Sequence, residues 1–269
     1  MATVLTIHPT RRLLALTLLS LAPLALTACR AEPPQLTVDV VARFPHDTAA
    51  FTEGLLYAHG LLYESTGLVG HSSLREVDPG SGQVIRERDL PAPYFGEGLA
   101  LVGDRLIQLT YKAGVAFAWD RETFNPLGSY HYQGEGWGLC FDGQSLYMSN
   151  GSATLTRRDP DTFAPQGTLT VRENGKPVKN VNELECANDS LYANVWLTDE
   201  ILRIDKRSGK VTAVIDASPL RAQLSGLDNP DAVLNGIAYD SAKKRFLVTG
   251  KLWPTMFQVR FVPAHAKGG

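Results

Sequence analysis

The stretch Phe95-Gly-Glu-Gly-Leu-Ala-Leu101 decides the fold, because its pattern of glycines and a glutamate before an apolar run recurs along the chain. The other copies are Phe51-Thr-Glu-Gly-Leu-Leu-Tyr57, Glu135-Gly-Trp-Gly-Leu-Cys-Phe141, Val181-Asn-Glu-Leu-Glu-Cys-Ala187 and Val233-Leu-Asn-Gly-Ile-Ala-Tyr239. Consecutive copies start about 40 to 52 residues apart, which is the repeat length of propeller blades. Chance similarity of turn-rich β sequence is the alternative, and five copies in order argue against it.

Each copy is followed by further short apolar runs that end at turns. The second runs are Gly60–Glu64, Asp104–Gln108, Gln144–Met148, Asp189–Ala193 and Lys244–Val248; third runs include Leu74–Asp78, Ala116–Asp120 and Ile201–Asp205, and fourth runs begin near Val84 and Val211. Glycine, proline and aspartate at the turns, with no sustained 3.6-residue period, indicate antiparallel strands. Four strands in each of five repeats predict an all-β fold, a five-bladed β-propeller.

The ends of the repeat region predict how the ring closes. The fifth repeat stops soon after Phe257–Phe261, so it is one strand short. Leu36–Phe44 is a lone strand before the first repeat, and we expect it to supply the outer strand of the last blade. Such closure removes unpaired sheet edges that invite aggregation.

The N-terminus resembles an export signal. Arg11 and Arg12 precede an apolar run, Leu13–Leu26, which is short for a membrane span and fits a signal sequence. The run leads into Thr27-Ala28-Cys29, which resembles a bacterial lipobox with Cys29 as the lipidated residue. Ordinary secretion with cleavage near Ala28 and an uncleaved anchor are the alternatives, and the paired arginines also resemble a twin-arginine export signal.

These features divide the chain into four parts. We predict a signal peptide over 1–28 with its lipobox ending at Cys29, a tether over 29–35, a five-bladed propeller over 36–263 and a tail over 264–269. The protein is then exported to the periplasm or cell envelope, and it touches a membrane only through the lipid anchor.

Composition excludes several classes of function. A net charge of −2 and a pI near 6.3 show no excess of basic residues of the kind that indicates nucleic-acid binding. Cys140 and Cys186 lack metal-ligand spacing, and the histidines form no metal motif, so we expect neither a metal nor a cofactor. Buried free thiols are the favoured interpretation of the two cysteines, and a disulfide in an oxidising envelope is the alternative.

Polar and aromatic residues gather at the repeat motifs, where the innermost strands of a propeller meet. The motifs and the runs after them place there Glu53, Glu97, Glu135, Trp137, Asn182, Glu183, Glu185, Tyr111, Trp196 and Lys251. Alternation along a strand sends neighbours to opposite faces, so only some of them can face a ligand. Each glutamate alone is more simply a turn or solvent residue; recurrence at one repeat position favours a site.

The same motifs resemble the plant- and bacterial-type glutaminyl-peptide cyclotransferases. The resemblance runs from about Thr37 to Phe261 and includes Asn194-Val-Trp, Leu234-Asn-Gly-Ile-Ala and Thr249-Gly-Lys-Leu-Trp-Pro. It implies a five-bladed propeller that converts N-terminal glutamine of peptides into pyroglutamate and releases ammonia. We expect a monomer whose partners are peptides or proteins with N-terminal glutamine.

The resemblance also implies residue roles. Glu97 matches the catalytic acid and base, and Asn182 and Lys251 match polar groups that bind the carboxamide and stabilise charge on its oxygen. The residues that match the pocket lining are Phe51, Phe95, Trp137 and Trp196. Glu53 and Tyr111 stand where the family pattern has glutamine and tryptophan, so these two positions bear on substrate preference.

Two other functions fit parts of the pattern. A non-catalytic envelope propeller that binds a peptide or partner protein is one. A calcium-dependent propeller hydrolase is the other, although Lys251 would repel a metal at the hub, the centre where the innermost strands of a propeller meet.

Overall fold

The computed structural model describes residues 1–6 and 32–264. Residues 1–6 are exposed without regular secondary structure, and they belong to a unit, Met1–Ala31, distinct from the body formed by Glu32–Gly269. Arg11, Arg12, the apolar run and Cys29 lie outside the described residues. Among the residues that are described, no helix is long and apolar enough to cross a membrane.

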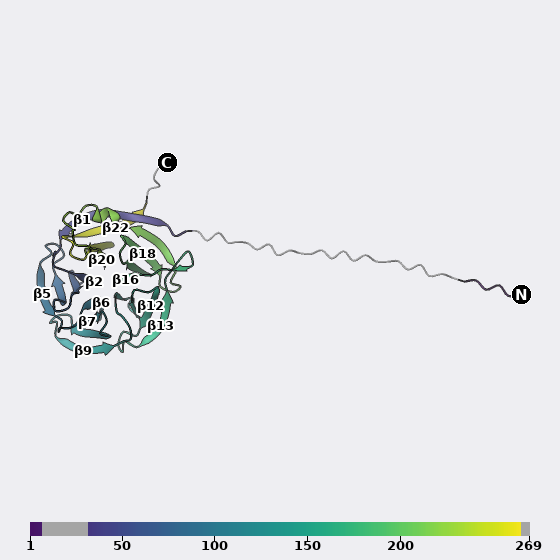
Figure 1. Ribbon diagram of the computed structural model, residues 1–269, viewed down its shortest axis with the longest axis horizontal. Coiled ribbons are helices and arrows are strands. Elements are labelled where there is room, and N and C mark those ends of the chain that lie inside the picture. Colours follow the sequence, from purple (N-terminus) through teal and green to yellow (C-terminus); the bar gives the residue numbers. More distant parts are fainter. Residues whose placement is uncertain (7–31, 265–269) are drawn as a thin grey trace. The chain divides into compact units, whose positions relative to one another are not determined.

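The body is all-β and consists of small antiparallel sheets. In the described part the strands form groups of four: β2 (Thr52–Ala58), β3 (Leu61–Thr66), β4 (Ser73–Val77), β5 (Val84–Asp89); β6 (Gly96–Val102), β7 (Arg105–Thr110), β8 (Val115–Asp120), β9 (Pro126–His131); β10 (Leu139–Phe141), β11 (Leu146–Met148), β12 (Thr154–Arg158), β13 (Pro165–Thr170); β16 (Val181–Ala187), β17 (Ser190–Val195), β18 (Glu200–Asp205), β19 (Val211–Asp216); and β20 (Leu234–Asp240), β21 (Arg245–Gly250), β22 (Thr255–Pro263), β1 (Gln35–Pro45). Within the body these groups surround a common centre, with β2, β6, β16 and β20 innermost (Figure 1).

The N-terminal strand completes the last group, as the sequence predicted. β1 pairs antiparallel with β22 from Leu36 to Pro45, so it is the fourth strand beside β20–β22. The sequence did not predict a second contact of this strand. Gln35–Thr37 also pair in parallel with Val214–Asp216 of β19, which joins the last two groups into one sheet of eight strands.

Glycines of the repeat motif let neighbouring innermost strands approach each other. A Cβ on Gly98 would lie 2.4 Å from the backbone nitrogen of Leu139, and one on Gly138 would lie 2.2 Å from the Asn182 carbonyl oxygen. No real side chain fits at such separations, so glycine is required where one group meets the next. The recurring glycine is therefore a packing requirement of the hub.

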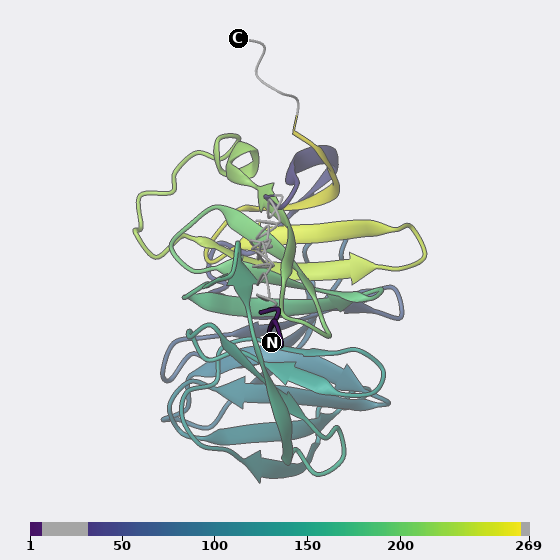
Figure 2. The same ribbon diagram turned by 90° about the vertical axis from the view of Figure 1, so that its right-hand side faces the viewer.

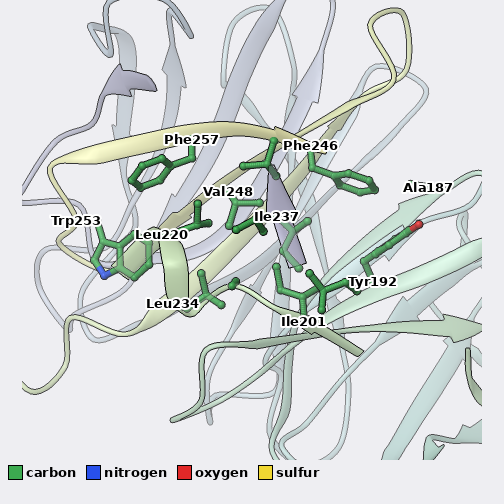
Figure 3. Close-up of a cluster of buried hydrophobic side chains, with 14 of the residues drawn as sticks. Ala187, Tyr192, Ile201, Leu220, Leu234, Ile237, Phe246, Val248, Trp253 and Phe257 are labelled. Atoms are coloured by element: carbon green, nitrogen blue, oxygen red, sulfur yellow. The ribbon is translucent and has the colours of Figure 1, made fainter. Parts of the chain in front are cut away.

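Apolar clusters fill the space between adjacent groups. The largest one joins the fourth and fifth groups and includes Ile201, Ile237, Val248 and Trp253 (Figure 3). Alternate residues of each strand contribute to these clusters, as half-buried strands require. Packing between the groups holds the innermost strands in place around the hub.

Three local features depart from the repeat pattern. The third innermost strand begins at Leu139, not Glu135, because the preceding Gly-Glu-Gly-Trp segment runs as an irregular loop. A small hairpin of β14 (Arg172–Glu173) and β15 (Lys176–Pro177) precedes the fourth group. A one-turn helix, α1 (Ser218–Arg221), and a following loop project beyond the strands before β20 (Figure 2).

The interpretation of Cys140 and Cys186 as free thiols is wrong. They form a disulfide, with Cα atoms 5.4 Å apart, between innermost strands β10 and β16. Both cysteines are the sixth residue of their motif copy, but the pairing of β10 with β11 and of β16 with β17 aligns Leu139 with Leu184, so Cys186 lies one position further along its strand than Cys140. The bond therefore ties two neighbouring groups together near the hub.

Candidate active site

A pocket of about 220 Å³ opens at the N-terminal ends of the innermost strands. Every residue to which the family resemblance assigns a site position lines it: Phe51, Glu53, Phe95, Glu97, Tyr111, Trp137, Asn182, Trp196 and Lys251. Leu197, Asp231 and Val233 complete the lining. Residues scattered over 200 positions of sequence, from Phe51 to Lys251, thus share one cavity.

Bulges in the innermost strands aim the polar residues at the hub. The register with the neighbouring strand shifts between Thr52 and Gly54, Gly96 and Leu99, Val181 and Leu184, and Leu234 and Ile237. A bulge leaves residues unpaired and redirects their side chains, and bulges are frequent beside active sites. The residues inside these shifts include Glu53, Glu97, Asn182 and Asn235.

Aromatic side chains form a continuous wall around the pocket. Ring centroids are 6.1 Å apart for Phe51 and Phe95, 5.8 Å for Phe95 and Tyr111, and 6.4 Å for Tyr111 and Trp137. Trp137 then meets Trp196 edge-on at 5.5 Å. Such contacts favour edge-to-face geometry and hold the wall rigid.

Lys251 and Glu53 form a buried ion pair in the lining of the pocket. Lys251 Nζ lies 2.6 Å from Glu53 Oε1 and 4.6 Å from the centroid of the Phe51 ring. Burial raises the pKa of Glu53 to about 7, and the charge of Lys251 acts in the opposite direction. The lysine reaches this position from the turn after β21, where its backbone N–H donates to the Val233 carbonyl.

Glu97 is buried, and one of its carboxyl oxygens has no partner. Its Oε2 is shielded from solvent and makes no hydrogen bond to the described residues. Burial, and then the negative charge of Glu53, raises the pKa of Glu97 well above the usual glutamate range, whereas Lys251 lowers it. A buried, unsatisfied carboxyl costs stability unless a ligand completes its contacts.

Asn182 meets a second buried amide, Asn235. Asn182 Nδ2 donates to Asn235 Oδ1 at 2.9 Å, and Asn235 Nδ2 donates to the Thr52 carbonyl at 2.9 Å. Asn235 Nδ2 also lies 3.3 Å from Glu53 Oε2. Asn182 Oδ1 is buried and has no partner among the described residues.

The other hub acids lie outside the pocket lining. Glu183 accepts hydrogen bonds from the backbone N–H groups of Ile237, at 3.0 Å, and Leu55, at 3.4 Å, so it ties innermost strands together. Glu185 lines a separate cavity toward the C-terminal ends of these strands. Glu135 accepts from the Trp137 indole N–H at 3.0 Å and lies 3.5 Å from Lys112, so it supports the aromatic wall from outside.

Sequence reasoning missed Leu197, Asp231, Val233 and the role of Asn235. Asn235 is the third residue of the fifth motif copy, Val233–Tyr239, as Glu53 and Glu97 are in theirs, so the repeat contained a signal for it. Asp231 lies in the irregular loop before β20, which no repeat predicts. In the described part of the chain, no three His, Cys, Asp or Glu side chains are placed to hold a metal ion.

Comparison with known proteins gives consistent matches. A family model described as glutamine cyclotransferase matches residues 13–261. The chain is 45% identical over 236 residues to a glutaminyl-peptide cyclotransferase of Arabidopsis thaliana, covering 86% of this chain and 73% of the relative. The crystal structure of Myxococcus xanthus glutaminyl cyclase matches with a TM-score of 0.82 and 42% identity, over 87% of this chain and all of the other (100%).

Proposed function

The chain belongs to the glutamine cyclotransferase family, and from that premise we propose that it converts N-terminal glutamine of peptides to pyroglutamate with release of ammonia. The observation that carries the proposal is a small pocket that combines an aromatic wall, a buried cation and a buried carboxyl with a free oxygen. A glutamine side chain is a flat amide on an apolar stem, so aromatic walls and polar lining groups suit it.

The reaction requires a folded substrate and one proton transfer. The neutral α-amine attacks the γ-carboxamide carbon, a new C–N bond forms, and the old C–N bond breaks as ammonia leaves. One proton must pass from the α-nitrogen to the departing nitrogen. Because ring closure is intramolecular, the pocket contributes mainly by holding the reactive conformer.

Glu97 is the proton carrier in this proposal. Its carboxylate accepts the proton from the α-nitrogen as the ring closes and then returns it to the departing nitrogen, so the residue ends as it began. A raised pKa makes this carboxylate a stronger base near neutral pH, and such transfer typically contributes about 10²–10⁴ in rate. The unpartnered oxygen is free to accept a hydrogen bond from the substrate nitrogen.

Lys251 is the electrostatic partner of the carboxamide oxygen. Negative charge develops on that oxygen when the carbon becomes tetrahedral, and a buried ammonium group stabilises it. Removal of one such donor typically costs about 10²–10³ in rate. Glu53 holds Lys251 by their 2.6 Å contact, so the cation is positioned before the substrate arrives.

We further propose that the five groups of strands are the blades of a five-bladed propeller, closed by β1 as the outer strand of the last blade. The pattern of Leu13–Leu26 and Cys29 supports export and lipid anchoring in the periplasm or cell envelope. Incorporation of a radiolabelled fatty acid that disappears in a Cys29→Ser variant tests the anchor. Sedimentation analysis tests the proposed monomer.

Ammonia release from a Gln-initiated dipeptide tests the function. The purified protein should release one ammonia per dipeptide and leave a product lighter by that mass. An N-acetylated Gln dipeptide, whose amine cannot attack, and an Asn-initiated dipeptide, whose ring would be four-membered, are the controls. Absence of ammonia from every Gln-initiated dipeptide would favour a binding propeller, and loss of activity with a chelator would favour a metal-dependent hydrolase.

A further inference from the structure

Asn235 is a fully buried amide that does not line the pocket but contacts two residues that do, Glu53 and Asn182, and the backbone of Thr52. Its Nδ2 lies 2.9 Å from the Thr52 carbonyl oxygen and 3.3 Å from Glu53 Oε2, and its Oδ1 lies 2.9 Å from Asn182 Nδ2. It stands inside the bulge between Leu234 and Ile237, where the register with β21 shifts. The site therefore has to explain why a polar side chain is buried here.

The backbone carbonyl of Thr52 fixes which way both amides face. A carbonyl oxygen only accepts hydrogen bonds, so Asn235 must turn its NH₂ group toward it. The Oδ1 atom of Asn235 then faces Asn182, so Asn182 must turn its own NH₂ group toward Asn235. A flipped pair would place Asn235 Oδ1 against the Thr52 carbonyl and Glu53, which brings acceptors together. The orientation thus follows from the network, which is the proper basis for assigning amides.

Asn182 consequently keeps its Oδ1 for the ligand. This atom is buried and unpartnered among the described residues, and Asn182 lines the pocket. The pocket then offers an ammonium donor from Lys251 and a carbonyl acceptor from Asn182. A primary carboxamide has a matching acceptor, its oxygen, and a matching donor, its NH₂ group.

We propose that Asn235 is a positioning residue that fixes Asn182 as the acceptor for the NH₂ group of the substrate's γ-carboxamide. This inference rests on the proposed function, and it changes the role that the sequence suggested for Asn182, from a group at the carboxamide oxygen to a group at the leaving nitrogen. As that nitrogen gains a proton, its hydrogen bond to Asn182 becomes charge-assisted and strengthens. The contact therefore favours the transition state over the bound substrate.

The same arrangement distinguishes glutamine from glutamate. A γ-carboxylate has the shape of the carboxamide but offers no donor, so its second oxygen would face Asn182 Oδ1. A site with a buried acceptor that binds a donor group of the substrate rejects analogues without that donor, because the acceptor would then be left unpaired. Asn235 acts on this selectivity without touching substrate.

The test compares the inhibition constant of a Glu-initiated dipeptide with the KM of the matching Gln-initiated dipeptide. Above about pH 5.5 the glutamate is ionised, so the ratio of the two constants measures selectivity. Asn235→Leu removes both amide contacts and frees Asn182 to rotate. We expect the ratio to fall by about 10- to 100-fold and kcat for glutamine to fall more than KM rises.

Asn235→Asp is the conservative variant with a diagnostic pH dependence. A protonated carboxyl can donate to Thr52 and accept from Asn182, so it reproduces the network; an ionised one cannot. Burial raises the pKa of such a carboxyl. Glu53 also faces this position, and burial raises its pKa to about 7 in the wild-type protein, so the selectivity of the variant is divided by that of wild type at each pH. We expect this quotient to be near one at the low end of the range and to fall as pH rises.

Several outcomes would overturn the proposal. Wild-type selectivity in Asn235→Leu, or an Asn235→Asp selectivity that follows the wild-type pH dependence, contradicts it. If Asn235→Leu shows no cooperative thermal unfolding, Asn235→Asp alone decides. Failure of the proposed function is seen separately, as absence of ammonia release by wild type.

Discussion

Two neighbouring residues of β16, Asn182 and Glu183, lie in two regions of the hub that differ in whether buried polar atoms have hydrogen-bond partners. Glu183 has both carboxyl oxygens within reach of backbone N–H groups from β2 and β20. In the pocket, by contrast, Asn182 Oδ1 and Glu97 Oε2 are buried and have no partner among the described residues. Both regions hold acids with pKa values raised by burial.

The difference separates structural from reactive groups. Burial and a raised pKa are common to Glu97 and Glu183, so neither property identifies the active carboxyl. Unsatisfied hydrogen-bonding capacity does, because native proteins rarely leave such atoms without a reason. The pocket carries these open positions where an aromatic wall and a cation also meet.

Glu97→Gln should give the largest effect. The amide cannot carry a proton, so we expect kcat for Gln-initiated dipeptides to fall by about 10²–10⁴. Removal of a carboxyl whose folded pKa is raised should increase the free energy of unfolding at neutral pH, because that group favours the unfolded state above its unfolded pKa. Ammonia release and urea unfolding measure the two effects, and unchanged kcat would remove Glu97 from the chemistry.

Lys251→Met should give the next largest effect. The variant keeps a long side chain over Phe51 but removes the cation, so we expect kcat to fall by about 10²–10³. It also leaves Glu53 without its 2.6 Å partner, which should raise the pKa of Glu53 further. Steady-state kinetics measure the change, and a rise in KM alone would show that Lys251 only binds substrate.

Glu183→Gln should be less stable than Glu97→Gln and spare the chemistry. One amide oxygen can still accept a backbone N–H, but the NH₂ group would face the other, at a cost of about 1–3 kcal/mol in the free energy of unfolding. Both variants lose a buried carboxyl whose pKa is raised, so this mismatched contact is what distinguishes them. At a temperature where the variant is folded, we expect ammonia release within a few-fold of wild type. A loss of kcat as large as that of Glu97→Gln would erase the contrast between the two regions.

Glu53→Gln should shift the pH profile and give the smallest effect. The negative charge of Glu53 raises the pKa of Glu97, whereas the positive charge of Lys251 lowers it. Glu53 is also paired with Lys251 and so reduces the effect of that positive charge on Glu97. Neutralising Glu53 therefore lowers the pKa of Glu97. The rate increases as Glu97 ionises, so the acid limb of kcat/KM should move to lower pH. A limb that stays in place or moves upward would contradict the coupling of these two acids.

The sequence predicted the residues of the pocket well because the repeats show which positions lie on the innermost strands. Equivalent positions in Phe51–Tyr57 and Phe95–Leu101 must lie together when repeats surround one centre. The strand order and the closing strand, Leu36–Phe44, follow from the same counting. The repeat also carried the signal for the Cys140–Cys186 disulfide, but spacing along the chain alone did not favour it.

What the sequence did not predict depends on side-chain direction or on irregular backbone. The motif places Asn182 at the hub but cannot show which amide atom faces the ligand, because that depends on the distant Thr52 carbonyl and Asn235. Asp231 and Leu197 enter the pocket from loops that no periodicity describes. Glu183 and Glu97 looked alike in sequence, and only their partners distinguish them.

The most direct measurement of the central claim places Glu97→Gln and Glu183→Gln side by side and records ammonia release and thermal unfolding for each. The substitutions are chemically identical, so any difference between them reports the surroundings of the two carboxyls. We predict that Glu97→Gln loses most of its rate and unfolds at a Tm no lower than that of wild type, whereas Glu183→Gln keeps its rate and unfolds at a lower Tm than Glu97→Gln. Equal loss of rate in both variants, or a full rate in Glu97→Gln, would contradict the account.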